Sequence, residues 1–150
     1  MDNEKVVQLV RRLRHDFGNH LQVIMSYNDL NRPQAIKDYI FTVVEEMAAE
    51  RRLFETLSPD PALYLLEQIY LAHDLGIILR YQELNINSAD ILRNHQEPFK
   101  SLESLSKKAI PSRDDDRIYY LSLLENEGQV KMVFASPELQ TDIEVVIDAD

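Results

Sequence analysis

Residues 6–27 read VVQLVRRLRHDFGNHLQVIMSY, and their apolar side chains recur every three or four positions. This spacing places them on one face of an α-helix, as in a heptad repeat. The members of this seam are Val6, Val10, Leu13, Phe17, His20, Ile24 and Tyr27. Asp2 is a suitable N-cap residue, so we expect a helix of about 25 residues, roughly 38 Å long, to begin there.

A second seam of the same period follows, with one polar interruption. Its members are Ile36, Ile40, Val43, Met47, Glu50, Phe54 and Leu57. Pro33 is expected to open this second helix. Pro59 and Pro61 are expected to end it near Leu57, because a residue before proline is pushed out of helical geometry. The connection, about residues 28–32, is short enough to force an antiparallel hairpin.

A single hairpin of this length would leave much of both apolar faces in water. Further apolar residues broaden the stripe beyond one seam: Leu9, Leu21, Val23, Ile36, Val44 and Leu53. Two hairpins side by side would bury these faces in a four-helix bundle, so we expect a homodimer. The alternative is a monomer in which the hairpin packs against residues 58–150.

The composition of the chain changes near residue 58. Residues 1–57 carry a net charge of −1, whereas residues 58–150 carry −9. Together with the prolines, this change predicts two domains, 1–57 and 58–150. In the second domain we expect helices over 61–73 and 98–109, strands over 77–84, 117–124, 129–135 and 142–147, a turn at 125–128, and loops at 85–97 and 111–116. This order predicts a small α+β layer, and hence an α+β fold for the chain.

The outer face of the first helix carries His15. At about 100° per residue, this histidine lies opposite the apolar seam. An exposed neutral imidazole is a good nucleophile near pH 7, because its reference pKa is about 6.5. The alternative is an inert surface histidine. His20, in contrast, lies on the seam and is expected to pack at an interface or to act there as a polar register residue.

Phosphoryl transfer needs positioning and charge neutralisation more than covalent machinery. If a partner brings Mg²⁺ and an aspartate, this chain needs only an accessible histidine and no cofactor of its own. The residues expected to orient or assist His15 are Asp16, Asn19 and Gln22. The residues expected to shape the docking surface are Arg11, Arg12, Arg14 and Gly18.

Gly18 is unusual because glycine within a helix costs about 0.5–1 kcal/mol relative to alanine. One interpretation is clearance, in which the absent side chain lets another protein approach His15. The other is close packing between helices or simple tolerance.

Residues 14–24 resemble the phosphoacceptor helix of the sporulation initiation phosphotransferase B family and the related dimerisation helices of citrate-type and quorum-type sensor histidine kinases. The residues that carry the resemblance are Arg14, His15, Asp16, Phe17, Asn19, Leu21, Gln22, Val23 and Ile24. The resemblance implies phosphorylation of His15, dimerisation through a four-helix bundle, and exchange of phosphate with receiver domains of response regulators. It also implies sporulation as the process.

Residues 61–77 resemble the opening helix and strand of the kinase ATP-binding domain, which implies an α/β sandwich. The helix expected over 98–109 lacks the asparagine with which a kinase binds magnesium. Gly18, Gly76 and Gly128 are far apart, so they cannot form the glycine-rich loop of such a domain. We therefore expect a degenerate ATPase-like domain, and a phosphotransferase rather than an ATP-dependent kinase.

The composition argues against several other functions. The chain has no cysteine, which excludes disulfides, thiol nucleophiles and zinc–thiolate sites. The net charge of −10 argues against nucleic-acid binding. No apolar run approaches the ~18 residues of a membrane span, so a cytoplasmic chain is expected.

Two His-Asp pairs raise the possibility of a metal-dependent hydrolase. His73 of the second pair is expected to turn inward from its helix, with Leu63, Leu66, Ile69 and Tyr70, as a core histidine. The run Asp114–Asp116 is expected to be a solvated turn. Neither feature therefore predicts a metal site.

Together these features predict a histidine phosphotransferase that moves a phosphoryl group between receiver domains through a phosphohistidine. The alternative is a non-catalytic dimeric module that binds a receiver domain or a histidine kinase without turning phosphate over. An unusual kinase is a third hypothesis, which micromolar ATP binding would support.

Overall fold

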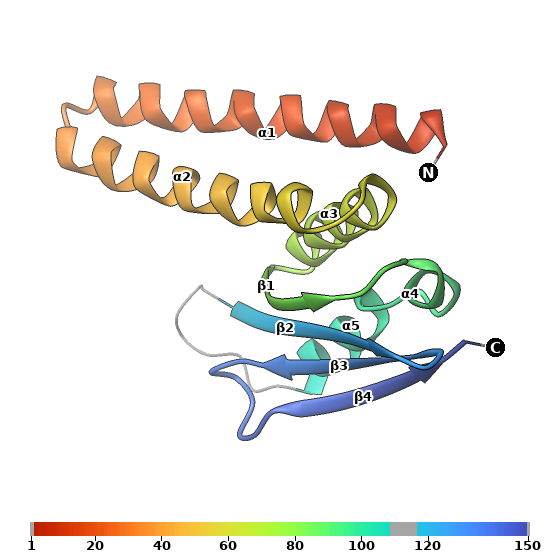
Figure 1. The fold of residues 1–150 in the computed structure, drawn as a ribbon. Helices are drawn as coiled ribbons and strands as arrows, with labels where there is room; N and C mark the ends of the chain where they lie inside the picture. The colour runs from red at the N-terminus through yellow and green to blue at the C-terminus, as the bar shows by residue number, and fades with distance from the viewer. Residues whose placement is uncertain (1, 109–116, 150) are drawn as a thin grey trace. The chain divides into compact units, whose positions relative to one another are not determined.

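The structure is a computed structural model that describes residues 2–108 and 117–149. Contacts between residues divide the chain into two compact units, Met1–Arg52 and Leu53–Asp150. This division falls a few residues before Leu57, where the sequence places the boundary. The elements are α1 (Asn3–Asp29), α2 (Pro33–Thr56), α3 (Pro59–Asp74), β1 (Ile77–Asn85), α4 (Asp90–Asn94), α5 (Phe99–Lys108), β2 (Arg117–Asn126), β3 (Gln129–Ala135) and β4 (Ile143–Asp148) (Figure 1).

Helices α1 and α2 form the predicted antiparallel hairpin (Figure 1). The Asp2 carboxylate accepts a hydrogen bond from the Lys5 N–H at 2.9 Å, which confirms the predicted N-cap. The connection turns at Asn31, whose φ is +56°, a conformation that asparagine tolerates better than most residues. The prolines begin and end α2 as expected, since it runs from Pro33 to Thr56.

The face that α1 turns toward α2 overlaps the predicted seam only in part. Val10, Leu13 and Phe17 are exposed, and the exposed fraction of Phe17 is 60%. Leu9 is buried, and the half-buried side chains of α1 are those of Val6, Arg12, Asp16, His20, Val23, Ile24 and Tyr27. Four of the seven seam residues thus face inward, whereas Val10, Leu13 and Phe17 lie in water in the single chain, as expected for a hairpin without a second copy. The physical reason is that α1 has two neighbouring apolar stripes, and a periodicity cannot say which one meets α2.

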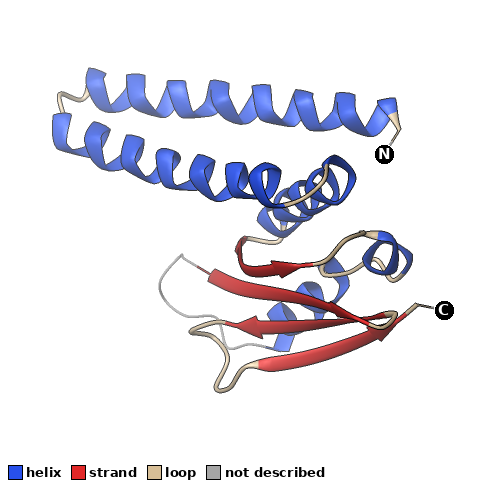
Figure 2. Cartoon of the chain, in the orientation of Figure 1, coloured by secondary structure: helices blue, strands red, loops and turns tan. Residues whose placement is uncertain are grey.

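The second unit holds a four-stranded sheet in the order β1-β2-β3-β4, which Figure 2 shows side by side. Strand β1 runs parallel to β2, and the remaining neighbours are antiparallel. Buried residues alternate with half-buried ones along β2, so the buried side chains lie on one face of the sheet, which the helices of this unit cover. The fully buried core includes Leu65, Ile77, Leu79, Leu102, Tyr119, Leu121, Leu123, Met132 and Phe134. The α+β fold is thus confirmed.

The turn between β2 and β3 is a two-residue hairpin. Asn126 pairs with Gln129, and the intervening Glu127 and Gly128 both have positive φ, +48° and +78°. Two positive φ angles match a type I′ turn, whose twist suits antiparallel strands. The predicted turn at 125–128 is confirmed, and the Gly128 conformation explains one of the three glycines.

Two predictions about the second unit are wrong. The expected loop over 85–97 contains the short helix α4, which is anchored by the buried Leu92. Five residues are too few to show a helical period. His73 is exposed rather than inward, and Leu63 is only half-buried. Helix α3 buries a wide arc of its surface, so its pattern defines the inward direction poorly. The loop expected at 111–116 and the run Asp114–Asp116 lie outside the described residues.

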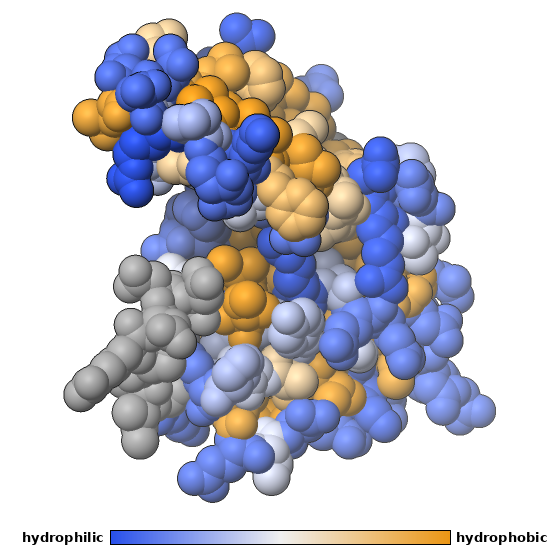
Figure 3. Space-filling model, turned by 90° about the vertical axis from the view of Figure 1, so that its left-hand side faces the viewer, coloured by the Kyte–Doolittle hydropathy of each residue, from blue (hydrophilic) through white to orange (hydrophobic). Residues whose placement is uncertain are grey.

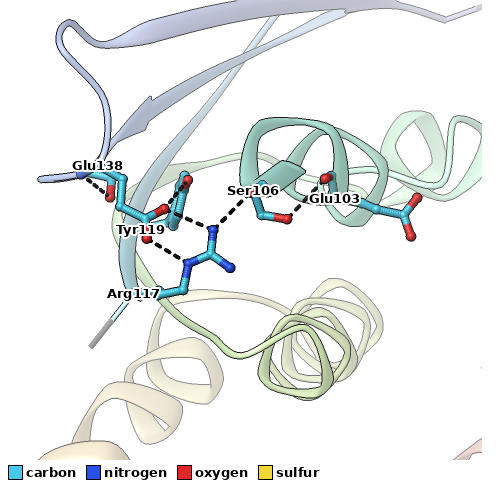
Figure 4. A network of polar contacts seen from close by, with 6 residues as sticks. Glu103, Ser106, Arg117, Tyr119 and Glu138 are labelled. Carbon is cyan, nitrogen blue, oxygen red and sulfur yellow. Dashed lines mark hydrogen bonds and ion pairs between the residues drawn. The ribbon is translucent and has the colours of Figure 1, made fainter. Parts of the chain in front are cut away.

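A buried ion pair joins β2 to the segment between β3 and β4 (Figure 4). Arg117 Nε donates to Glu138 Oε1 at 2.6 Å, and Arg117 Nη2 donates to Glu138 Oε2 at 3.1 Å and to the Ser106 carbonyl at 3.0 Å. The Tyr119 hydroxyl donates to the same carboxylate at 2.8 Å. The side chain of Glu138 is 2% exposed. These hydrogen bonds, chiefly that from Arg117, lower the pKa of Glu138.

This ion pair predicts a specific loss of stability in acid. As the pH falls, the unfolded chain protonates Glu138 first, because its pKa there is the ordinary 4.5 and folding lowers it. The contribution of the pair is therefore complete above that value and is lost as the pH falls through the lower pKa of the folded state. Glu138→Gln should reduce the free energy of unfolding at pH 7 by about 1–3 kcal/mol and flatten its dependence on pH below 4.5.

Urea unfolding followed by circular dichroism between pH 3 and 7 measures this effect. The matched control is Glu144→Gln, because Glu144 lies 3.7 Å from Lys131 in an exposed pair. The control should keep the wild-type pH dependence. Parallel curves for the wild type and Glu138→Gln would show that the ion pair is not the acid-sensitive element.

Candidate functional site

His15 lies midway along α1 with its side chain 72% exposed. Two residues of its own helix approach Nδ1: Asn19 Nδ2 at 3.4 Å and Asp16 Oδ1 at 3.7 Å. Among the described residues, no polar group contacts Nε2. Nε2 is thus the ring nitrogen that a visiting molecule can reach.

The two neighbours of Nδ1 favour different tautomers of His15. The Asn19 amide donates, so it favours an unprotonated Nδ1 and a proton on Nε2. The Asp16 carboxylate accepts, so it favours a proton on Nδ1 and a free electron pair on Nε2. At 3.7 Å the Asp16 contact is longer than a hydrogen bond and would need to shorten to about 3 Å. A shorter contact with Asp16 would therefore favour the tautomer with a nucleophilic Nε2.

Asp16 is also bound to Arg12, whose Nε lies 3.3 Å from its Oδ2. Both side chains are half-buried and lie one helical turn apart. Arg12 is therefore engaged within the helix and holds the Asp16 carboxylate beside His15. Arg11 and Arg14, which flank it, are exposed. They are the arginines that remain available to a docking partner.

Gly18 has open space around it. A methyl group built on its Cα would meet nothing within 4 Å. Close packing against another helix therefore does not explain this glycine among the described residues. Clearance for a second molecule and simple tolerance of glycine remain as explanations.

Gly18→Ala is accordingly predicted to make the protein more stable but to weaken its binding of a partner. We expect the free energy of unfolding to rise by about 0.5–1 kcal/mol, because alanine is the better helix former and has room. We expect binding of a receiver domain to weaken, because the new methyl group occupies the approach to His15. Urea unfolding and titration calorimetry measure the two quantities. Unchanged receiver binding in the more stable variant would contradict the clearance interpretation.

The polar stripe beyond His15 continues toward the end of α1. Asn19, Gln22 and Ser26 line a shallow groove of about 450 Å³, together with Val23, Tyr27 and Leu30. The Ser26 hydroxyl donates to the Gln22 carbonyl at 2.9 Å, so it is turned back onto its own helix. Gln22 and His15 thus share one continuous polar face of α1, and Gln22 makes no contact with the imidazole.

A second stripe on the hairpin is apolar and exposed, and we call it the apolar face. It consists of Val10, Leu13, Phe17, Leu21 and Met25 on α1 with Ile40, Val44 and Met47 on α2. At about 100° per residue, it lies roughly 100° around α1 from the side that meets α2 and roughly 140° from His15. Helical geometry places it on the same side of the hairpin on both helices. Figure 3, which faces the end where α1 and α2 connect, shows apolar side chains at the surface of the hairpin.

Residues 2–108 and 117–149 contain no group of three or more His, Cys, Asp or Glu side chains placed to hold a metal ion. Within the same ranges, none of the helices combines the length and the apolar character that crossing a membrane requires.

The long helical hairpin with its outward histidine is the part of the chain that matches a known family. Residues 1–56 match the family model described as the sensor kinase SpoOB-type, alpha-helical domain. This match suggests a module of phosphotransfer or of kinase-associated dimerisation, and it confirms the resemblance seen in the sequence over this segment. No curated protein matches the chain.

One contact near the site was not predicted. His20 Nδ1 lies 2.7 Å from the Tyr39 hydroxyl, so the two helices are joined by a hydrogen bond between side chains. The sequence placed His20 on the seam, but it gave no reason to single out Tyr39. The available signal was the register of the hairpin, which sets these residues at the same level of the two helices.

Proposed function

We propose that this chain is a histidine phosphotransferase of a two-component phosphorelay. His15 takes a phosphoryl group from the aspartyl phosphate of one receiver domain and passes it to the aspartate of another. The observation that carries this proposal is the exposed His15 imidazole, whose Nε2 has no polar partner among the described residues. The family match of the surrounding helices supports it.

The transfer balances as a displacement at phosphorus. The electron pair of Nε2 forms a P–N bond, and the P–O bond to the receiver aspartate breaks with its electron pair left on the carboxylate. The imidazole keeps its proton on Nδ1 and becomes positively charged, and Asp16 accepts a hydrogen bond from that proton. The second receiver aspartate reverses these steps. If the receiver carries Mg²⁺, that ion would neutralise the phosphoryl charge, and the proposed transfer would need no metal from this chain.

The neighbours of His15 have separate roles in this proposal. Asp16, held by Arg12, orients the imidazole and stabilises its charge. Asn19 competes for the same nitrogen and releases it when Asp16 closes. Arg11 and Arg14 attract an acidic receiver surface, and the polar face through Gln22 contacts it.

The protein acts as a homodimer in this proposal. The apolar face of one hairpin packs against that of a second copy, which gives a four-helix bundle. Support comes from the angle of roughly 100° between the apolar face and the side that meets α2, because a helix in such a bundle has two neighbours at about a right angle. His15 then points away from both neighbours.

Residues 58–150 are proposed to form a degenerate ATPase-like domain, an α/β sandwich without nucleotide chemistry. Helices cover one face of its sheet, as that architecture requires. Helix α5 contains no asparagine for magnesium, and the chain has no glycine-rich loop. These features favour transfer from a phosphorylated protein over transfer from ATP.

The experiment that tests the function is phosphoryl transfer from receiver domains. Receivers encoded in the same genome are phosphorylated with acetyl phosphate and mixed one by one with the protein. Acid-labile, base-stable label on the protein is the expected result. Binding of a receiver without any label would instead support the alternative, a dimeric module that binds a receiver or a kinase without turning phosphate over.

A further inference from the structure

The contact between α1 and α2 is polar near the level of His15. Arg12, Asp16 and His20 are half-buried on the α1 side, and Tyr39 and Glu46 are half-buried on α2. Polar residues in a helical seam stabilise less than apolar ones of the same size, and their best-attested use is to fix how the helices meet. Half-buried apolar residues complete the contact, chiefly toward the connection: Val23 and Ile24 on α1 with Ile36 and Val43 on α2. We therefore infer that the polar residues near His15 contribute direction more than stability.

His20 and Tyr39 form the clearest directional contact in the seam. Their 2.7 Å hydrogen bond is part-buried, and the two rings lie with centroids 5.7 Å apart. Tyr27 packs edge-on against Tyr39 at 6.3 Å. Burial raises the pKa of Tyr39, so its hydroxyl stays protonated. It donates to His20 Nδ1 in the tautomer of His20 that carries its proton on Nε2. We infer that formation of this hydrogen bond fixes the rotation of α1 about its own axis.

His15 lacks any comparable restraint of its own. Its described polar contacts, at 3.4 and 3.7 Å, come from its own helix, and they turn with it. His20 follows five residues later, which is about 7.5 Å along the axis and about 140° around it. Because α1 is one continuous helix, a bond that directs His20 toward α2 also directs His15 away from it.

The sensitivity of this arrangement follows from simple geometry. A turn of α1 by about 30° would move a side-chain atom some 7 Å from the axis by about 3.5 Å. The same turn would break the His20–Tyr39 hydrogen bond. Misplacement by about 1 Å is enough to slow a positioned reaction roughly 100-fold.

We propose that His20 and Tyr39 are a positioning pair, which holds α1 at the rotation that presents His15 Nε2 to a docked receiver domain. This proposal rests on the proposed phosphotransferase function. Neither residue touches the phosphoryl group. They act through the helix that carries the acceptor.

The test uses the full-length protein and three substitutions. His20→Leu removes the acceptor but fills the seam. His20→Asn keeps an acceptor close to the place of Nδ1. Tyr39→Phe removes only the donor, and its matched control is Tyr27→Phe, because the Tyr27 hydroxyl makes no hydrogen bond to a described residue. Three quantities are measured: the thermal midpoint, the rate of transfer from a phosphorylated receiver, and the rate of labelling by phosphoramidate, a small donor that needs no docking.

We expect transfer from the receiver to fall about 10- to 100-fold in His20→Leu and Tyr39→Phe. It should stay within about threefold of the wild type in His20→Asn and Tyr27→Phe, and the double variant His20→Leu/Tyr39→Phe should be no slower than either single one. Labelling by phosphoramidate should stay at the wild-type rate throughout. A purely structural role predicts the opposite order for the two His20 variants, because leucine stabilises a helical seam better than asparagine.

The possible failures are distinguishable. If no receiver labels the wild type, the phosphotransferase function itself is wrong. If the wild type is labelled and His20→Leu is labelled equally fast, the positioning pair is wrong. The pair is also wrong if the rates follow the thermal midpoints, or if phosphoramidate labelling falls in parallel with receiver transfer.

Discussion

His15→Ala is expected to abolish phosphoryl transfer to this protein. The proposed acceptor is Nε2 of an imidazole that is 72% exposed, and alanine offers no nucleophile in its place. Label from a phosphorylated receiver should fall to background, a loss of about 100-fold or more. The fold should be unaffected, because the described contacts of the His15 side chain are the weak ones to Asn19 and Asp16.

The matched control for this prediction is His73→Ala. His73 is also exposed and also precedes an aspartate, but it lies on α3 in the second unit. The His73→Ala variant should retain full labelling, and its phosphate label should resist alkali and be released by acid. Persistent label in His15→Ala would reject the assignment of the acceptor. Loss of label in both variants would point to a general defect rather than to the acceptor.

Phe17→Glu is expected to convert a dimer into monomers. Phe17 lies in the middle of the apolar face with an exposed fraction of 60%, and in a symmetric dimer the substitution would bury two carboxylates. Burying an unpaired charge at an interface costs several kcal/mol, so the dimer should weaken at least about 100-fold. Sedimentation equilibrium over a range of concentrations measures this effect.

Gln8→Glu serves as the control for Phe17→Glu. Gln8 is exposed on the same helix but lies roughly 140° or more around it from the centre of the apolar face, so the same change in charge should leave the dimer intact. Wild-type protein that stays monomeric at every concentration would show that this face does not join two copies. Equal weakening by both substitutions would show that net charge, rather than burial, controls association.

Local signals in the sequence predicted the elements of the fold well. Asp2 capped α1, Pro33 opened α2, and Pro59 followed its end, because each of these effects depends on neighbouring residues alone. The alternation of apolar and polar residues likewise predicted strands β2 and β3, and Gly128 predicted the turn between them. Short-range physics therefore accounts for where elements begin and end.

What the sequence could not predict depends on which surfaces meet. The periodicity of α1 is compatible with two adjacent apolar stripes, and only tertiary contact shows that the Arg12–Asp16–His20 side meets α2. The same limit explains the wrong direction of His73 on α3. Helix α4 is too short to have a period at all. The outward position of His15 was predictable because His15 lies far from both apolar stripes. The hydrogen-bond partners of His15 could not be predicted in this way.

The most direct test of the central proposal is to locate the phosphate on the protein. After transfer from a phosphorylated receiver, digestion under alkaline conditions and tandem mass spectrometry identify the modified residue among the four histidines. Phosphate on His15 alone is the predicted result. Phosphate on His20, His73 or His95, or on no histidine at all, would contradict the proposal that α1 displays the phosphoryl acceptor.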